Sequence, residues 1–286
     1  MSRSNTLYLI EEGVSLLESR GVPEARLTAE LLLSHVLKQS AFSLYLNPQE
    51  TMDEEYERCY RELLSLRSQR HPLQYLVREV QFRSSILEVG PGCLIPRPET
   101  ELLVDVVLRR VGRETEAVKI LDVGTGSGNI GISLLVERNK WRVIGTDCMK
   151  DACDYASRNA VRNGVSNRFR AVHTDFWKGL EGEVFDGLIS NPPYLTVGEV
   201  ASLQPEVSYE PAVALDGGED GLVFFRAIAC NAKKMIHAGG FIFFEVGAGQ
   251  AKTVADLLEA NVFSSVEVET DDSGIERMVS GCLNHG

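Results

Sequence analysis

The strand and glycine loop over residues 120–131 most constrain how the chain can fold. Ile120-Leu121-Asp122-Val123 is typical of a buried strand, and it leads directly into Gly124-Thr125-Gly126-Ser127-Gly128-Asn129-Ile130-Gly131. Glycines allow the backbone to approach a ligand closely, and the helix that they open presents an N-terminus that favours negative charge. A strand, a glycine loop and a helix in this order indicate the first unit of a nucleotide-binding α/β sheet.

Beyond this loop, strands and helices alternate as far as the C-terminus, which predicts a doubly wound α/β sheet. The last two strands are close together in the sequence, so we expect them to pair as an antiparallel hairpin at the edge of the sheet. The predicted strands are Lys119–Val123, Arg142–Thr146, Phe169–His173, Phe185–Ser190, Gly240–Val246, Ser265–Thr270 and Glu276–Gly281.

The chain before the sheet divides into a helical part and a connecting part. Apolar residues recur at helical spacing in three segments, which predicts a small helical bundle. The stripes expected to face its core are Leu7, Ile10, Val14 and Leu17; Leu27, Leu31, Leu32 and Val36; and Tyr56, Tyr60 and Leu63. Alternation around Arg83-Ser84-Ser85 then predicts a β-hairpin. We therefore expect a helical domain over residues 1–73, a hairpin linker over 74–94, and an α/β domain over 95–286.

Composition narrows the class of function. The 286 residues carry a net charge of -12 without a run of Lys or Arg, which argues against direct nucleic-acid binding, because such binding depends on neutralising phosphates. The six scattered cysteines and five histidines have no metal-ligand spacing. The sequence shows no signal-peptide pattern and no membrane-spanning apolar run. We expect a cytoplasmic monomer with reduced thiols that binds neither a metal nor a membrane.

Two features after the glycine loop indicate a nucleoside cofactor. Asp147 ends the next strand, where a carboxylate can accept hydrogen bonds from both ribose hydroxyls. Asp175 and Phe176 follow the third strand and could contact an adenine amino group and ring; a strand-end turn and a core aromatic residue are the alternative for this pair. The glycine loop also satisfies the dinucleotide G-x-G-x-x-G pattern, so these features alone leave a dinucleotide oxidoreductase open.

The segment Asn191-Pro192-Pro193-Tyr194 favours a different cofactor. Its prolines turn the chain out stiffly after the fourth strand, where open α/β sheets bind ligands. The Asn191 side-chain oxygen and the Pro192 carbonyl can accept both hydrogens of one planar NH2 group, and Tyr194 can stack on it. A plain loop is the alternative for this sequence. Together with Asp122, which could fix the glycine loop and reach a ligand ammonium, the segment favours S-adenosylmethionine, whose methyl group would lie beside Asn191.

These residues resemble a known family. The glycine loop, Asp147 and the Asn-Pro-Pro-Tyr segment look like those of class I (Rossmann-like) methyltransferases that act on planar amino groups. More specific motifs resemble the PrmC/HemK family of release factor glutamine methyltransferases: Leu94-Ile95-Pro96-Arg97-Pro98-Glu99-Thr100-Glu101, Tyr209–Leu215 with Gly217-Gly218, and Phe244-Glu245-Val246-Gly247 with Gln250. The resemblance runs from about Gln74 to the C-terminus, and the helical part has the family's size and place. One departure is Arg78, which stands after Tyr75-Leu76-Val77 where the family usually has a glycine.

The resemblance implies a class I methyltransferase sheet with an antiparallel last strand and a helical domain that recognises the substrate. It implies methylation of the side-chain amide nitrogen of the glutamine in the Gly-Gly-Gln motif of class 1 peptide chain release factors. S-adenosylmethionine would be the methyl donor, with no metal, and the loop from Arg97 to Glu101 would cover its methionine end. By position, the cofactor would contact Gly124, Thr125, Gly126, Ser127, Gly128, Asp147, Phe176 and Asn191. The glutamine would be held by Asn191, Pro192, Pro193 and Tyr194, of which Asn191, Pro192 and Tyr194 would be catalytic.

Two other classes of protein stay open from the sequence. An adenine-amino methyltransferase that acts on nucleic acid would share the Asn-Pro-Pro-Tyr segment, although the acidic charge and the lack of a basic recognition domain count against it. A cofactor-binding interaction protein without catalytic activity would share the glycine loop and could use the helical domain to bind a partner.

Overall fold

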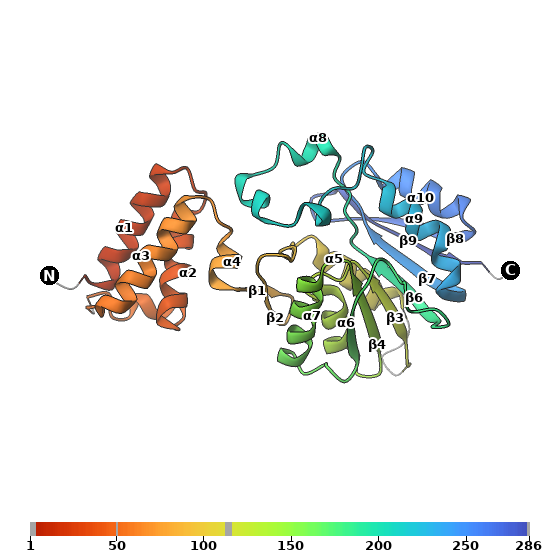
Figure 1. Ribbon diagram of the computed structural model, residues 1–286, viewed down its shortest axis with the longest axis horizontal. Coiled ribbons are helices and arrows are strands. Elements are labelled where there is room, and N and C mark those ends of the chain that lie inside the picture. The colour runs from red at the N-terminus through yellow and green to blue at the C-terminus, as the bar shows by residue number, and fades with distance from the viewer. Residues whose placement is uncertain (1–3, 50, 112–115, 285–286) are drawn as a thin grey trace. The chain divides into compact units, whose positions relative to one another are not determined.

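The computed structural model describes residues 4–49, 51–111 and 116–284 and divides the chain into two compact units (Figure 1). Unit 1 comprises Met1–Glu79 together with Gln204–Tyr209, and unit 2 comprises Val80–Leu203 and Glu210–Gly286. The short segment Gln204–Tyr209 therefore packs with the helical unit, although the residues on both sides of it belong to the other unit.

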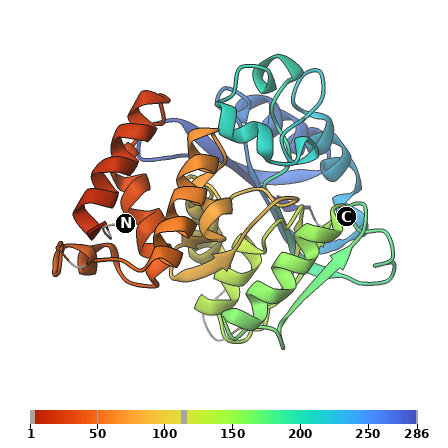
Figure 2. The same ribbon diagram turned by 60° about the vertical axis from the view of Figure 1, so that its left-hand side comes forward.

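Unit 1 is a bundle in which three helices pack against one another (Figure 1, Figure 2). The first helix begins after Asn5, whose side chain accepts a hydrogen bond from the Tyr8 N–H and so caps the helix. The helices of this unit are α1 (Thr6–Ser19), α2 (Ala25–Leu37), α3 (Glu54–Ser68) and the short α4 (Leu73–Val77), with 3-10 helices at Ala41–Tyr45 and Pro205–Tyr209.

The core of the bundle differs in part from the predicted stripes. Leu7, Leu27 and Tyr56 are 36%, 48% and 45% exposed, so their predicted burial is wrong. The core is formed by Leu9, Ile10, Val14, Leu17, Leu32, Leu33, Tyr60 and Leu64, among others. Where apolar residues occupy neighbouring positions, helical periodicity fits two overlapping stripes equally well, and packing against the other helices decides between them.

Arg78 follows α4 as its C-terminal cap with φ 61° and ψ 19°, in the left-handed region. Glycine adopts this conformation without steric strain, whereas other residues adopt it at a cost of about 1–2 kcal/mol. The exposed Arg78 therefore stands at a turn whose backbone favours glycine.

An ion-pair cluster fixes Gln204–Tyr209 to α3 within unit 1. Arg67 Nη1 and Arg70 Nη2 donate to the two oxygens of Glu206 at 2.8 and 2.7 Å. The Arg67 side chain is only 6% exposed, so this pairing is shielded from water. Burial by itself would raise the pKa of Glu206, but the hydrogen bonds from Arg70 and Arg67 outweigh it and lower that pKa.

Unit 2 is built on a mixed sheet that, in the described part of the chain, has seven strands in the order β5-β4-β3-β6-β7-β9-β8. β9 runs antiparallel to both β7 and β8, whereas the other pairs are parallel. The α/β sheet and the antiparallel edge hairpin predicted from the sequence are confirmed. The strands are β3 (Lys119–Val123), β4 (Arg142–Asp147), β5 (Phe169–His173), β6 (Phe185–Ser190), β7 (Ile236–Glu245), β8 (Phe263–Thr270) and β9 (Glu276–Leu283).

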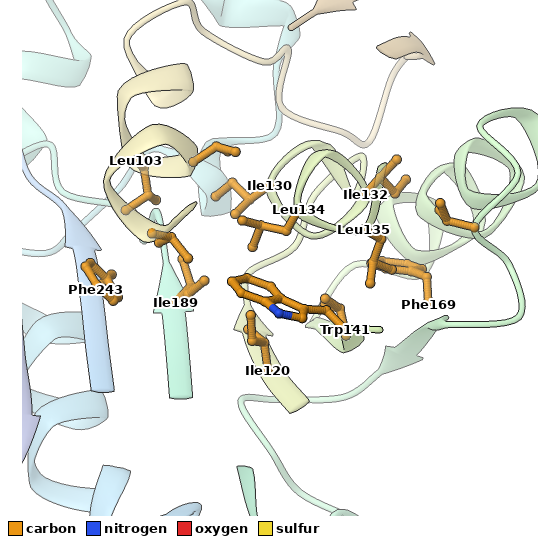
Figure 3. Packing of buried hydrophobic residues seen from close by; sticks show 14 of the residues in the cluster. Leu103, Ile120, Ile130, Ile132, Leu134, Leu135, Trp141, Phe169, Ile189 and Phe243 are labelled. Atoms are coloured by element: carbon orange, nitrogen blue, oxygen red, sulfur yellow. The ribbon is translucent and has the colours of Figure 1, made fainter. Parts of the chain in front are cut away.

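Helices cover both faces of this sheet, and each face has its own core (Figure 1). Successive strand residues point to opposite faces, so Ile120 joins one core and its neighbour Leu121 the other. In the first core, Trp141 lies between Ile120 of the sheet and Leu134 of a covering helix (Figure 3). The first face carries α5 (Thr100–Arg110), α6 (Asn129–Glu137) and α7 (Lys150–Arg162), and the second carries α9 (Val223–Asn231) and α10 (Ala251–Ala260).

The predicted hairpin forms between β1 (Glu79–Phe82) and β2 (Ser85–Glu88), which make a separate two-stranded sheet. Phe82 and Leu87 are buried in the same core as α5, α6 and α7, which attaches the hairpin to unit 2. The remaining short elements of unit 2 are α8 (Val197–Val200) and the 3-10 helices Ala212–Ala214 and Ala232–Lys234.

We expect Glu206→Ala to lower the local free energy of unfolding of unit 1 by about 3 kcal/mol at neutral pH, because it leaves the buried Arg67 charge unpaired. Since the folded-state pKa of Glu206 is lowered, its stabilising effect is present above the unfolded-state pKa and is lost as the pH falls through the folded-state value. Hydrogen exchange of residues 204–209 measures this effect directly.

The matched control is Glu62→Ala, which removes an exposed ion pair from the same helix as Arg67. Such pairs contribute about 0–1 kcal/mol, so this change should leave exchange at residues 204–209 as in the wild type. Equal exchange rates in Glu206→Ala and Glu62→Ala would contradict the proposed role of the ion-pair cluster.

Candidate active site

Three parallel strands of unit 2 end at the same level. Val123 of β3 pairs with Thr146 of β4 and with Ser190 of β6. The glycine loop, Asp147 and Asn191 are the next residues along their respective strands. The register therefore brings the main predicted site residues to one edge of the sheet, as expected for ligand binding in open α/β sheets.

A pocket opens at this edge, with about 970 Å³ of empty space including its open mouth. This size suits a nucleoside-sized ligand. Among the residues predicted to contact cofactor or substrate, the pocket is lined by Gly124, Gly126, Ser127, Asp147, Phe176, Asn191, Pro192 and Pro193. The other predicted residues, Thr125, Gly128 and Tyr194, lie next to the lining rather than in it.

The glycine loop contributes backbone to the pocket wall. Gly124 and Gly126 have φ values of 73° and 54°. A Cβ on either residue would meet no heavy atom within 4 Å, so both open into free space. Thr125 is buried instead, and its hydroxyl donates to Asp122 Oδ2 at 2.7 Å. Gly128 caps α6 with φ 83°, so Thr125 and Gly128 shape the loop while its other glycines line the pocket.

Asp147 joins the end of β4 to the glycine loop. Its Oδ2 accepts from the Gly126 N–H at 2.9 Å, and its Oδ1 accepts from the Met149 N–H at 2.8 Å. Burial raises the pKa of Asp147, and these two backbone hydrogen bonds act in the opposite direction. Each carboxylate oxygen keeps a second lone pair, so Asp147 can still accept from hydroxyl groups of a ligand.

Phe176 lines the pocket and has an unusual backbone conformation. Its φ is 55°, in a region that bulky residues rarely adopt and that is often found at functional sites. The centroid of its ring lies 6.0 Å from that of Phe224 on α9, and both residues line the pocket. Sequence reasoning missed Phe224, because an aromatic residue in an apolar helix is typical of a core position. Asp175 also lines the pocket and pairs with Lys178.

The Asn191 side chain is held in one orientation. Its Nδ2 donates to Thr100 Oγ1 at 3.1 Å. Because the nitrogen end of the amide is engaged with Thr100, the oxygen end is left for a ligand. Asn191, Pro192 and Thr100 all line the pocket, so the two predicted acceptors and the hydrogen-bond partner of one of them belong to the same site.

The backbone of Tyr194 is hydrogen-bonded to Gln250. Its carbonyl oxygen accepts from Gln250 Nε2 at 2.9 Å, and Gln250 Oε1 accepts from the Gly247 N–H at 3.0 Å. Burial, followed by the nearby Glu245 carboxylate, raises the pKa of Tyr194 to about 12. The phenol therefore stays neutral at physiological pH and is not a base.

Glu210 connects two motifs that are more than one hundred residues apart in the sequence. Its buried carboxylate accepts from the Ile95 N–H at 2.9 Å and pairs with the Arg97 guanidinium. The segments on both sides of this link form one part of the pocket wall, with Leu94, Pro96, Arg97 and Thr100 from the first and Pro211, Val213 and Ala214 from the second.

Neither a metal-binding cluster nor a membrane-spanning helix is found in residues 4–49, 51–111 and 116–284. In these ranges, no group of three or more His, Cys, Asp or Glu side chains is arranged to hold a metal ion. No helix there combines the length and apolar character that crossing a membrane requires.

Solved structures share this architecture. A methyltransferase from Pyrococcus furiosus superposes with a TM-score of 0.54 and 18% identity, over 71% of this chain and 91% of that chain. The 16S rRNA N2 G1207 methyltransferase of T. Thermophilus gives a TM-score of 0.54 and 19% identity, over 72% of this chain and 50% of that one. These likenesses show the fold, which is that of a class I methyltransferase sheet.

Sequence comparison identifies the family. Residues 9–77 match the PrmC N-terminal domain, and residues 98–207 match the methyltransferase small domain. The release factor glutamine methyltransferase of Thermodesulfovibrio yellowstonii is 38% identical over 88% of this chain and 90% of its own length. That of Geobacter sulfurreducens is 37% identical over 93% and 92%. The chain belongs to the release factor glutamine methyltransferase family, which confirms the resemblance found in its motifs.

The buried Asp122 predicts a specific pH dependence of stability. Burial raises the pKa of Asp122 to about 6, against the hydrogen bond from Thr125. The folded state therefore holds a proton on Asp122 over a pH range in which the unfolded state has lost it, so stability falls as the pH rises from about 4 to about 6. In Asp122→Asn this contribution disappears, while an oxygen that can accept from Thr125 remains.

We expect the free energy of unfolding of Asp122→Asn, relative to wild type, to increase by up to about 3 kcal/mol between pH 4 and pH 7. Urea denaturation at a series of pH values measures this difference. The exposed Asp272→Asn is the control and should follow the wild-type profile. Parallel profiles for Asp122→Asn and wild type would show that burial does not shift this carboxyl group.

Proposed function

We propose that this protein methylates the side-chain amide nitrogen of the glutamine in the Gly-Gly-Gln motif of class 1 peptide chain release factors. The observation that carries the proposal is the held amide of Asn191, whose nitrogen donates to Thr100 and whose oxygen is left for a ligand at the pocket wall. Membership of the release factor glutamine methyltransferase family supports the same substrate.

The pocket residues fit S-adenosylmethionine as the methyl donor. Gly124 and Gly126 offer a wall of backbone into which no side chain projects. Asp147 would accept from ribose hydroxyls, and Phe176 with Phe224 would contact the flat base. When bound, this cofactor supplies an electrophilic methyl group on a positively charged sulfur. Direct contact of the cofactor with these residues, and with Thr125, Ser127, Gly128 and Asn191, stays a prediction.

The residues expected to bind the substrate would compensate for the weak nucleophilicity of a carboxamide nitrogen. The lone pair of its nitrogen is delocalised into the carbonyl group, so the nitrogen must be held and aimed. Asn191 Oδ1 and the Pro192 carbonyl would accept its two hydrogens, and Pro193 and Tyr194 would confine the flat group. Alignment of this kind can lower a barrier by roughly 7–11 kcal/mol. The nitrogen gains the methyl group and releases one proton afterwards, so a strong base is not required.

The proposal also covers substrate recognition, cellular location, oligomeric state and nucleic-acid binding. The helical domain would recognise the release factor, and the enzyme would act in the cytoplasm as a monomer, without binding nucleic acid directly. These four statements stay predictions. A nucleic-acid substrate fits less well with the net charge of -12.

Transfer of labelled methyl from S-adenosylmethionine to a recombinant class 1 release factor tests the proposed reaction. We expect label on the factor that carries Gly-Gly-Gln and none on a Gly-Gly-Ala version or on duplex DNA. Label on DNA would instead assign the protein to the adenine-amino methyltransferases. A complete lack of transfer, with cofactor binding intact by calorimetry, would indicate a non-catalytic binding protein.

We expect Asn191→Ala to lower the rate of methyl transfer by at least about 100-fold, because the substrate amide loses one of its two acceptors and its alignment. Single-turnover kinetics with saturating cofactor measure this rate, and thermal unfolding shows whether the variant is folded. The exposed Asn139→Ala serves as a control for the loss of an amide elsewhere in unit 2. Normal turnover in Asn191→Ala would rule out the proposed acceptor role.

A further inference from the structure

We propose that Glu245 is a positioning residue that sets the direction of a hydrogen-bond chain through Thr100 to Asn191 and thereby presents the Asn191 oxygen to the substrate amide. This inference rests on the proposed function, because it explains how that acceptor is kept in place. Glu245 itself does not line the pocket, so we assign it no contact with the substrate.

The sheet places Glu245 beside Asn191, and Thr100 of α5 is hydrogen-bonded to Asn191. Ser190 of β6 pairs with Phe244 of β7, and the next residues along these parallel strands are Asn191 and Glu245. Thr100 is the first residue of α5 and is buried. It lines the pocket and accepts from Asn191 Nδ2 at 3.1 Å. The carboxylate therefore lies behind a residue of the pocket wall.

The burial of Glu245 is not explained by packing. Glu245 is 2% exposed, and its Oε2 has no hydrogen-bond partner in the described parts of the chain. A buried and incompletely paired carboxyl group destabilises a folded protein relative to an apolar residue of similar size. A role in orienting the neighbouring side chains explains why a carboxylate occupies this buried position.

Two donors and several charges act on this carboxylate. Burial raises the pKa of Glu245 to about 7, and the nearby Thr100 hydroxyl and Asn191 amide, both able to donate, lower it. Glu99 also raises this pKa and Arg277 lowers it. Tyr194, whose own pKa Glu245 raises, stays neutral. The ionised form is thus the one that the neighbouring donors stabilise.

The chemistry of the three side chains fixes the direction of the chain. An ionised carboxylate can only accept, so the Thr100 hydroxyl directs its hydrogen toward Glu245. The lone pairs of that hydroxyl then accept from Asn191, and only the nitrogen end of the amide can donate. The Asn191 oxygen is consequently turned toward the ligand.

A neutral amide at position 245 would remove this constraint. Glutamine can donate as well as accept, so the Thr100 hydroxyl could rotate and donate to Asn191 instead. The Asn191 amide would then be free to flip and present its NH2 group to the NH2 group of the substrate. Two donors facing each other cannot hydrogen-bond, and the substrate nitrogen would lose its alignment.

The test compares Glu245→Gln with wild type in methyl transfer to a release factor. We expect kcat to fall by about 100-fold, as for other losses of alignment, with the affinity for S-adenosylmethionine unchanged by calorimetry. We also expect the wild-type rate to rise with pH near neutrality as Glu245 ionises, and this rise to be absent in Glu245→Gln. Glu276→Gln, an exposed change on the neighbouring strand β9, is the control and should keep the wild-type profile.

A second pair of variants tests the same chain of hydrogen bonds at Thr100. Thr100→Val removes the hydroxyl and should lose as much activity as Glu245→Gln, whereas Thr100→Ser should restore most of that loss. This pair decides the question if Glu245→Gln does not fold. A Glu245→Gln enzyme with wild-type kcat and pH profile, or a Thr100→Val enzyme as active as Thr100→Ser, would overturn the inference. Lack of methyl transfer by the wild type would instead refute the proposed function.

Discussion

The parallel register of four strands is the constraint on which the site depends. β3, β4, β6 and β7 end within one residue of one another, so the loops that follow them open at the same edge. A shift of one residue in any strand would turn its last side chain to the other face of the sheet. The glycine loop, Asp147, Asn191 and Glu245 are neighbours because backbone hydrogen bonds fix this register.

Much of the fold was predictable because its signals are local. β3, β5 and β6 begin and end where apolar runs and their flanking residues predicted. β7 begins at Ile236, earlier than predicted, because Gly239 and Gly240 are typical of a strand boundary but are accommodated inside this strand. In the helical unit, the sequence showed that helices form but not which residues face inward, since that choice depends on contacts between helices.

The site divides in the same way. Residues within continuous motifs, such as the glycine loop and Asn191–Tyr194, could be predicted, because the chemistry of each motif is contained in a few adjacent positions. The role of Phe224 and the link from Glu210 to Arg97 could not be predicted. Each joins segments separated by dozens of residues, and single-sequence reasoning has no physical signal for such a contact before the topology is known.

In two places a buried acidic residue lies behind a threonine of the site. Asp122 accepts from the Thr125 hydroxyl behind the glycine loop. Glu245 lies near the Thr100 hydroxyl and the Asn191 amide, which lower its pKa. In both places an acid is buried at a cost in stability, and burial raises its pKa. In return, an ionised carboxylate fixes the direction of a hydrogen bond, because it can accept but cannot donate. A threonine hydroxyl can rotate, so a fixed acceptor behind it turns an adaptable group into a directed one. The side chains of the pocket wall are therefore oriented by buried residues behind them. Substitutions of those buried residues would change the direction of hydrogen bonds without removing a contact to the ligand.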